Sequence, residues 1–337
     1  MKNQSIILPE FGIQNLQVFE AEMPERQTGG VRVRIHTVSL NYRDLMMVEG
    51  RYNPRIPMPL IPLSDGAGTV VESDADSPFQ PGDRVMTRMV PGWDEGMVPT
   101  DAHKRSLGGP QPGCLRHFAD FPASALLPIP DSMDMDLAAC VPVAALTAFR
   151  ALKDAGVGPD SRVLTLGTGG VSLFALQFAK ALGAKVAITS SSDQKLEHAR
   201  NLGADVWVNY KKIAEWDRAV LQHWPEGVDT VIEVGGQGTF NRSVKAARLG
   251  GNIALIGVLA DEATEPILLT RVLMKNLKVQ GTLVGDAKTQ AACAQFLVEH
   301  GIQPVLHRVF EGLGASQEAF ELLASAQHMG KILIRLA

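Results

Sequence analysis

The sequence has few cysteines, few aromatic side chains, no long apolar run and no strong excess of one charge. Its 337 residues include 3 cysteines, 3 tyrosines and 4 tryptophans. Cys114, Cys140 and Cys293 are widely separated and form no CxxC pair. This pattern excludes a disulfide framework and a structural zinc knot. The net charge of −4 gives no electrostatic reason to expect a nucleic-acid partner.

The apolar stretches are interrupted by polar or glycine residues short of the roughly 20 residues that a membrane helix needs. Residues 1–12, MKNQSIILPEFG, lack the apolar segment and cleavage site of a signal peptide. We therefore predict a soluble, cytoplasmic protein with no membrane partner. The composition, 45% hydrophobic and 20% charged, is that of a globular protein, and the length suggests two domains.

The most informative segment is residues 161–192, SRVLTLGTGGVSLFALQFAKALGAKVAITSSS. It predicts a strand, a glycine-rich turn, a helix and a second strand, which together form a dinucleotide-binding βαβ unit. Gly167 allows the tight turn, and Gly169 lets the backbone approach a pyrophosphate. Gly170 and Val171 begin the helix, whose free N–H groups favour an anion. The alternative is a glycine turn that binds no ligand.

The end of the second strand indicates which dinucleotide is bound. An NAD site usually has an acidic residue there for the ribose 2′-hydroxyl group. Here Ser190 and Ser191 occupy the position, with Lys195 just beyond and Tyr210 after the next strand. Hydroxyl donors and a lysine suit a 2′-phosphate, so we predict NADP(H) as the cofactor. Asp193 in the same loop would repel that phosphate if it pointed inward.

The rest of the chain predicts an α/β fold in which a nucleotide-binding domain is inserted into a β-rich domain. Residues 1–122 contain short strands separated by Pro, Gly and Asp turns. A helix is expected over residues 133–155. Alternating strands and helices then indicate a Rossmann domain over residues 123–285, with a doubly wound parallel sheet. Residues 286–337 return to the first domain. The expected Rossmann strands are residues 162–166, 186–189, 205–208, 228–233, 252–257 and 277–283.

This layout resembles the medium-chain dehydrogenase/reductase superfamily over essentially the whole chain. The segments that carry the resemblance are SLNYRDL (39–45), PLIPLSDGAGTVVE (59–72), PGDRV (81–85), LTAFRAL (146–152), the βαβ unit and MGKILI (329–334). The resemblance implies a GroES-like β-rich catalytic domain, a Rossmann domain and an active site in the cleft between them.

The superfamily contains zinc-dependent alcohol dehydrogenases and zinc-free reductases. The zinc branch has a cysteine where this chain has Asn41, and a histidine where it has Ser64. The second cysteine of the zinc branch falls near Val143 of this chain. Catalytic zinc needs about three Cys, His or carboxylate ligands, and Asp65 could supply only one. We therefore expect no metal, and a similarity to the zinc-free quinone oxidoreductase branch.

A zinc-free site can still pass a hydride from NADPH to an already electrophilic carbon, so the expected acceptors are quinones and α,β-unsaturated carbonyl compounds. Asn41 is the first candidate to donate a hydrogen bond to the acceptor, although an asparagine can also simply stabilise a turn. Tyr42 could contact the acceptor or pack in the core. Ser64 is expected to shape the pocket, and Trp93 could form a pocket wall. Arg43 and Asp44 are expected to form an ion pair that fixes the loop.

The resemblance also assigns residues around the cofactor. Thr147 is expected against the nicotinamide ring, Gly257 and Val258 at the carboxyl end of the fifth strand, and Leu283 near the nicotinamide carboxamide. Lys331 is expected to reach the ribose or a phosphate.

Two other functions remain open. One is a metal-free alcohol or carbonyl dehydrogenase, and the other is a nucleotide-binding protein with little turnover. The resemblance further implies a homodimer joined through the edge of the Rossmann sheet, around residues 279–284.

Overall fold

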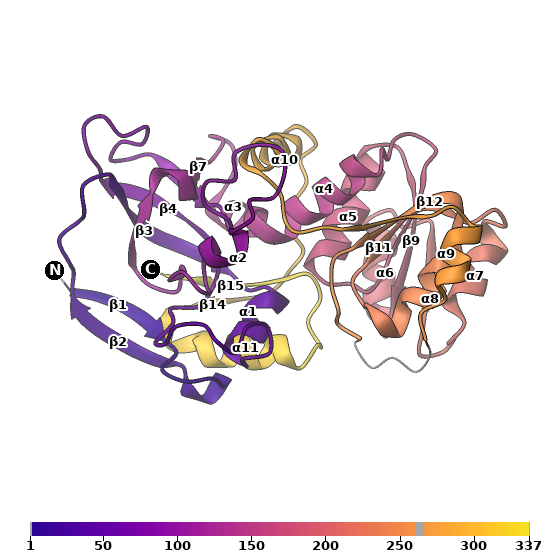
Figure 1. Ribbon diagram of the computed structural model, residues 1–337, viewed down its shortest axis with the longest axis horizontal. Helices are drawn as coiled ribbons and strands as arrows, with labels where there is room; N and C mark the ends of the chain where they lie inside the picture. Colours follow the sequence, from indigo (N-terminus) through magenta and orange to yellow (C-terminus); the bar gives the residue numbers. More distant parts are fainter. Residues whose placement is uncertain (1, 261–265, 337) are drawn as a thin grey trace. The chain divides into compact units, whose positions relative to one another are not determined.

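The computed structural model describes residues 2–260 and 266–336. The chain divides into two compact units (Figure 1). The terminal unit combines the residues up to Leu146 with those from Val284, and the inserted unit is Thr147–Leu283. The first boundary thus lies later than the predicted residue 122. The reason is that β7 (Leu126–Pro128) pairs with β5 (Arg84–Thr87) of the terminal unit. In addition, α3 (Met135–Cys140) packs against β3 (Gly30–Ser39) and β4 (Asp65–Glu72) of the same unit.

The terminal unit is built around one seven-stranded sheet. Its order is β14-β15-β3-β4-β5-β7, with β6 paired to β3, and a separate hairpin joins β1 to β2. The strands are β1 (Lys2–Ile7), β2 (Gln17–Glu22), β3 (Gly30–Ser39), β4 (Asp65–Glu72), β5 (Arg84–Thr87), β6 (Phe118–Pro122), β14 (Leu306–Glu311) and β15 (Lys331–Arg335).

Strand β3 connects the core of this sheet to the polar residues described below. Val31, Val33 and Ile35 alternate along it and are buried in the hydrophobic core. The pairing with β4 shifts register between Ile35 and Thr37. This shift interrupts the alternation of buried and exposed side chains before the strand ends. Val38 and Leu40 are then also buried, and the chain enters α1 (Tyr42–Val48) directly after Asn41.

The inserted unit contains the predicted Rossmann sheet. Six parallel strands have the order β10-β9-β8-β11-β12-β13. Their ranges are β8 (Arg162–Thr165), β9 (Lys185–Ser190), β10 (Val206–Asn209), β11 (Val228–Glu233), β12 (Ala247–Leu255) and β13 (Lys278–Gly281). The strand order reverses between β8 and β11, and ligands of such sheets bind at the carboxyl ends of the strands at this point.

Helices complete both units (Figure 1). The terminal unit also has α2 (Ala102–Arg105), α10 (Ala287–Glu299) and α11 (Ser316–Ala324), and the inserted unit has α5 (Gly170–Ala181), α6 (Asp193–Asn201), α7 (Trp216–His223), α8 (Gln237–Ala246) and α9 (Leu269–Met274). The boundary between the units passes through the start of α4 (Leu146–Asp154).

The predicted helix over residues 133–155 is a continuous helical run, Met135–Asp154, with a π-helical turn at Val141–Ala145. By length and composition alone this run could cross a membrane. This differs from the expectation that every apolar stretch is too short for a membrane helix. However, 72% of its most apolar window is buried inside the structure, as in the core helix of a soluble protein.

Candidate functional site

A cluster of buried polar side chains lies where β3, β4 and β15 come together in the terminal unit. We call Asn41, Asp44, Ser64, Asp65 and Lys331 the Lys331 cluster. All five are at most 8% exposed. They lie close together because Ser39 of β3 pairs with Asp65 of β4 and with Leu333 of β15.

The amide group of Asn41 is held in one orientation. The Lys331 ammonium donates to Asn41 Oδ1 and to the Leu40 carbonyl, both at 2.6 Å. Asn41 Nδ2 donates to Asp65 Oδ2 at 2.9 Å. In the described part of the chain this leaves one amide hydrogen of Asn41 without an acceptor, available to an oxygen of a bound molecule.

The charge of the Lys331 ammonium acts on two buried carboxyl groups, those of Asp44 and Asp65. Burial raises the pKa of Asp65 to about 7, the Lys331 charge opposes this, and the neighbouring Asp44 adds to it. Burial likewise raises the pKa of Asp44, against the effect of the Arg43 guanidinium. The Asp65 carboxyl accepts a further hydrogen bond from Ser64 Oγ at 3.0 Å. Asp65 therefore titrates near neutral pH rather than in the ordinary acidic range.

This shift predicts that Asp65→Asn changes the pH dependence of stability. With a pKa of about 7 against an ordinary 3.8, the folded protein holds a proton that the unfolded chain releases over that interval. The free energy of unfolding of the wild type should therefore fall as the pH rises from about 4 to about 7. Asp65→Asn should lack this component and be the more stable protein at about pH 8. Denaturant unfolding of both proteins across this range measures the difference, and parallel curves would contradict the assignment.

Neighbouring polar groups fix the backbone around Ser64. Thr87 Oγ1 donates to the Ser64 carbonyl at 2.8 Å and accepts from the Gly66 N–H at 3.0 Å. Gln290 of α10 donates to the Thr87 carbonyl at 2.8 Å. Thr87 and Gln290 were not singled out from the sequence, because a side chain that bonds to distant backbone leaves no local pattern.

The other residues proposed near Asn41 have structural contacts. Tyr42 is half-buried against the core, and its hydroxyl accepts from Arg51 at 3.4 Å. Arg43 forms the expected ion pair with Asp44 at 3.7 Å and also donates to the carbonyls of Leu107 and Gly109. Trp93 is 2% exposed, so it is a core residue.

The donor set around Asn41 does not fit a catalytic zinc ion. The amide oxygen that would have to bind the metal already accepts from the Lys331 ammonium. Two carboxyl groups contact Asn41: that of Asp65 accepts from the Asn41 side-chain amide, and that of Asp44 accepts from the Asn41 backbone N–H, each at 2.9 Å. Over residues 2–260 and 266–336, no group of three or more His, Cys, Asp or Glu side chains is placed to hold a metal ion. The three cysteines are free, in agreement with the absence of a disulfide pattern in the sequence, and all three are buried.

The glycine-rich turn of the inserted unit has the predicted form. Gly167 has φ +72°, and its N–H donates to Thr189 Oγ1 at 3.2 Å. Gly169 is the N-cap of α5, which begins at Gly170 and Val171. The Ser172 hydroxyl donates to the Leu166 carbonyl at 2.6 Å, which joins the helix closely to the strand. The first N–H groups of α5 are thus oriented toward the carboxyl end of β8, where a pyrophosphate would be bound.

Of the residues predicted around a 2′-phosphate, three lie at the carboxyl ends of the paired strands β9 and β10, namely Ser190, Ser191 and Tyr210, and Lys195 lies in α6. Ser190 ends β9, Ser191 follows it, and the Tyr210 N–H donates to the Ser190 carbonyl at 3.0 Å. Burial and the nearby Lys211 ammonium lower the pKa of Lys195. The Asp193 carboxylate accepts from Asn209 at 2.7 Å and from Lys212 at 2.5 Å, so its charge is compensated.

The remaining predicted cofactor residues occupy both units. Thr147 is buried in α4, and Leu283, at the end of the inserted unit, accepts from Arg150 at 2.9 Å. Gly257 and Val258 follow β12; a Cβ at Gly257 would lie 2.7 Å from the Val234 carbonyl, so no side chain fits there. Lys331 belongs to the terminal unit, where its ammonium donates to Asn41 and Leu40, and its contact with a ribose or phosphate stays a prediction.

One buried carboxylate was not anticipated. Glu233 ends β11 and is fully buried, and it accepts from the N–H groups of Gly235 and Gly236 and from the hydroxyls of Thr239 and Ser243. This group fixes the turn into α8 at the carboxyl edge of the sheet. The signal in the sequence is an acidic residue at the end of an apolar strand, followed by a valine and then two glycines.

Two family models match the chain. The model described as the alcohol dehydrogenase GroES-like domain matches residues 27–131. The model described as zinc-binding dehydrogenase matches residues 170–299. The first lies in the terminal unit, and the second covers most of the inserted unit together with α10.

Individual proteins match over nearly the whole length. The chain is 38% identical to the zinc-type alcohol dehydrogenase-like protein C1773.06c of Schizosaccharomyces pombe, over 96% of each chain. It is 27% identical to the probable quinone oxidoreductase of Leishmania amazonensis, covering 95% of this chain and 93% of that protein. A crystal structure of an NAD-dependent alcohol dehydrogenase superimposes with a TM-score of 0.89 at 28% identity, over 99% of this chain and 100% of the other. With both units, both family models and these relatives in agreement, the chain belongs to the medium-chain dehydrogenase/reductase superfamily of oxidoreductases.

Proposed function

We propose that the protein is a zinc-independent, NADPH-dependent reductase of quinones or α,β-unsaturated carbonyl compounds. The observation that carries the proposal is the Lys331 cluster, in which the Lys331 ammonium and the Asp65 carboxyl group fix the amide of Asn41, the residue that by resemblance replaces a cysteine ligand of the zinc branch. Such a site lacks a metal to activate an alcohol. It suits acceptors whose conjugation already spreads the negative charge that develops on their oxygen.

The proposed role of the terminal unit is to stabilise the negative charge that develops on the acceptor oxygen. NADPH, when bound, would supply the hydride and be left as NADP+. In an enone the hydride would form a C–H bond at the β-carbon, and the C=C electron pair would shift onto the carbonyl oxygen to give an enolate; in a quinone the same two electrons and one proton would give the hydroquinone monoanion. We assign to Asn41 the hydrogen bond to that oxygen, through the amide hydrogen that Asp65 does not use. Lys331 and Asp65 are positioning residues, because they hold the amide in the donating orientation. The enolate or hydroquinone anion then takes a proton from water.

The turnover experiment compares a panel of quinones and enones, followed by the absorbance of NADPH, with NADH in parallel. We expect reduction of at least one acceptor class with NADPH. Oxidation of simple alcohols without reduction of either class would favour the metal-free alcohol dehydrogenase instead. NADPH binding with no turnover of any compound would favour the nucleotide-binding protein.

The preference for NADPH is supported by the groups at the end of β9. Lys195 and Lys211 are close enough for one charge to affect the other, and a bound phosphate would relieve their repulsion. Ser191, which is partly exposed, adds a hydroxyl group there, whereas Ser190 is 2% exposed and its hydroxyl lies 3.4 Å from that of Thr168. One structural relative is named as an NAD-dependent alcohol dehydrogenase. The preference of this chain between NADPH and NADH therefore has to be measured directly.

Lys195→Ala should weaken NADPH binding selectively. Loss of one hydrogen bond to a charged group costs about 1.5–3 kcal/mol, so the Kd for NADPH should rise by about tenfold to a hundredfold. The Kd for NADH should change by less than about threefold, because NADH has no 2′-phosphate. Fluorescence titration measures both constants, with Lys153→Ala, an exposed position on α4, as the control. An unchanged Kd for NADPH would contradict the assignment of this pocket.

We also propose a cytoplasmic homodimer formed through the edge of the Rossmann sheet. Edge strand β13 is exposed along its whole length. Near it in the chain, α9 exposes Leu269, Leu273 and Met274, each more than 70% accessible. Contiguous exposed apolar groups beside an open strand edge are typical of an association surface.

Leu273→Glu should therefore convert a dimer to a monomer, because it places a charge within the proposed contact. Light scattering after size exclusion measures the mass of both proteins. Met97→Glu is the matched control, since Met97 is 91% exposed but belongs to the terminal unit. A monomeric wild type would contradict the proposed dimer.

A further inference from the structure

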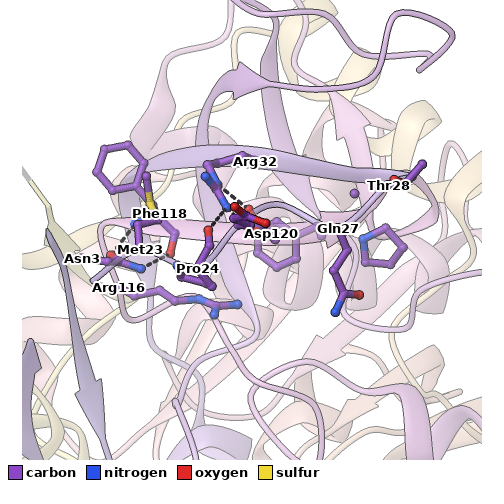
Figure 2. Close-up of a pocket in the computed structure, with 14 residues that line it drawn as sticks. Asn3, Met23, Pro24, Gln27, Thr28, Arg32, Arg116, Phe118 and Asp120 are labelled. Atoms are coloured by element: carbon purple, nitrogen blue, oxygen red, sulfur yellow. Dashed lines mark hydrogen bonds and ion pairs between the residues drawn. The ribbon is translucent and has the colours of Figure 1, made fainter. Parts of the chain in front are cut away.

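A hollow lies in the terminal unit, apart from the Lys331 cluster. It has a volume of about 500 Å³ and is lined by strand β6, the segment before β3 and the start of β1. Figure 2 shows its labelled residues. None of its lining residues belongs to the Lys331 cluster. The hollow is near the start of β3, whereas Asn41 follows the end of that ten-residue strand, about 30 Å along an extended chain.

The two arginines in this hollow differ in their partners. Arg32 is fully satisfied, since it donates to Asp120 at 2.8 and 2.9 Å and to the Pro24 carbonyl at 2.6 Å. Arg116 has no carboxylate within ion-pair distance among the residues that the structure describes. Its Nε atom is buried and has no hydrogen-bond partner. Figure 2 shows its guanidinium group apart from the Arg32–Asp120 pair.

An unpaired, partly buried guanidinium is unfavourable. The planar group packs over the Phe121 ring, with 5.8 Å between the guanidinium carbon and the ring centre. Burial lowers the pKa of Arg116, with opposing effects from Cys114 and Asp120. Arginine nevertheless stays charged in proteins, so burial leaves a cation with unused donors. A bound anion is the partner that would satisfy them.

The walls of the hollow limit the kind of anion. Met23, Pro24 and Phe118 supply apolar surface on which a hydrocarbon body could pack. The Glu25 carboxylate also lines the hollow, and the charge of Asp120 is already balanced by Arg32. One unpaired cation beside one acidic side chain favours a single negative charge over a doubly charged phosphate. The volume is within the range of small-molecule sites.

We propose that this hollow binds a small organic carboxylate, with its carboxylate paired to Arg116 and its apolar part against Met23, Pro24 and Phe118. Binding here is independent of the proposed reductase activity. It can therefore be tested on the full-length protein without any assay of turnover.

The test is calorimetric titration with benzoate and hexanoate, with benzamide and inorganic phosphate as comparison ligands. We expect saturable binding of at least one carboxylate to the wild type, and no detectable binding of benzamide, which is uncharged. Arg116→Met should weaken carboxylate binding at least tenfold. This variant should fold at least as stably as the wild type without ligand, because it removes an unpaired charge and keeps an apolar stem on Phe121. Arg55→Gln, an exposed arginine that does not line the hollow, should bind like the wild type.

A thermal unfolding series gives a second readout for the same proteins. Benzoate or hexanoate should raise the Tm of the wild type and of Arg55→Gln, but not that of Arg116→Met. The proposal is overturned if neither carboxylate binds at 10 mM, or if Arg116→Met binds as tightly as the wild type. Tighter binding of phosphate or equal binding of benzamide would also overturn the assignment of the ligand class.

Discussion

Lys331→Met is expected to lower the free energy of unfolding by about 3–5 kcal/mol, because it removes two buried hydrogen bonds from a charged donor, each of which contributes about 1.5–3 kcal/mol. Lys331 is 3% exposed, and its ammonium bonds to Asn41 and to the Leu40 carbonyl. Methionine fills a similar volume, so the loss comes from the charge and its hydrogen bonds rather than from a cavity. Denaturant unfolding at neutral pH measures the change.

Two further variants separate this effect from a general loss of packing. Lys331→Met combined with Asp65→Asn should recover more than about 1 kcal/mol of the loss, because a neutral amide needs no cation beside it. Lys288→Met is the matched surface control. Its ammonium pairs with Glu95 at 2.6 Å, but both side chains are well exposed, so the change should stay within about 0.5 kcal/mol. Equal losses for Lys331 and Lys288 would refute a special role for the buried cluster.

Asn41→Ala is expected to lower kcat/KM for the best quinone or enone acceptor by about 10²- to 10³-fold, the usual effect of deleting a donor to a developing oxyanion. The Kd for NADPH should change little, because Asn41 belongs to the terminal unit and the glycine-rich turn to the inserted unit. Steady-state kinetics and fluorescence titration on the same preparation test both statements.

The control for this prediction is Asn53→Ala in the same unit. Asn53 accepts a hydrogen bond from the backbone of Arg55 and does not touch the Lys331 cluster, so activity should stay within about twofold. Thermal unfolding must show that Asn41→Ala is folded at the assay temperature, because the substitution also removes the Lys331 and Asp65 contacts. A folded Asn41→Ala protein with activity within threefold of the wild type would contradict the role of this amide.

The fold could be predicted well from the sequence because its strongest signals are local. The apolar run over residues 228–233 coincides with β11, and the helix expected after Gly170 is α5. The strand over residues 277–283 is shorter in the structure, as β13 spans Lys278–Gly281. The first domain boundary was placed too early because β7 and α3 pack by long-range pairing, which no local pattern reveals.

The site could be predicted only in part. Asn41 and Ser64 were found by resemblance, but their hydrogen bonds depend on Lys331, which lies 290 residues beyond Asn41 in the chain. The sequence suggested that Lys331 reaches a ribose or phosphate, whereas its ammonium is bound within the terminal unit. A sequence pattern can place a lysine at the start of a strand. The pairing of β3 with β15 then determines which polar groups its ammonium contacts.

The most direct test of the proposed function is the NADPH-dependent reduction of the best acceptor by protein of measured metal content, before and after dialysis against a zinc chelator. We predict a turnover rate that chelation leaves unchanged, in protein that holds well under one zinc ion per chain. Near-stoichiometric zinc, with activity that is lost on chelation and restored by added zinc, would contradict a zinc-independent reductase.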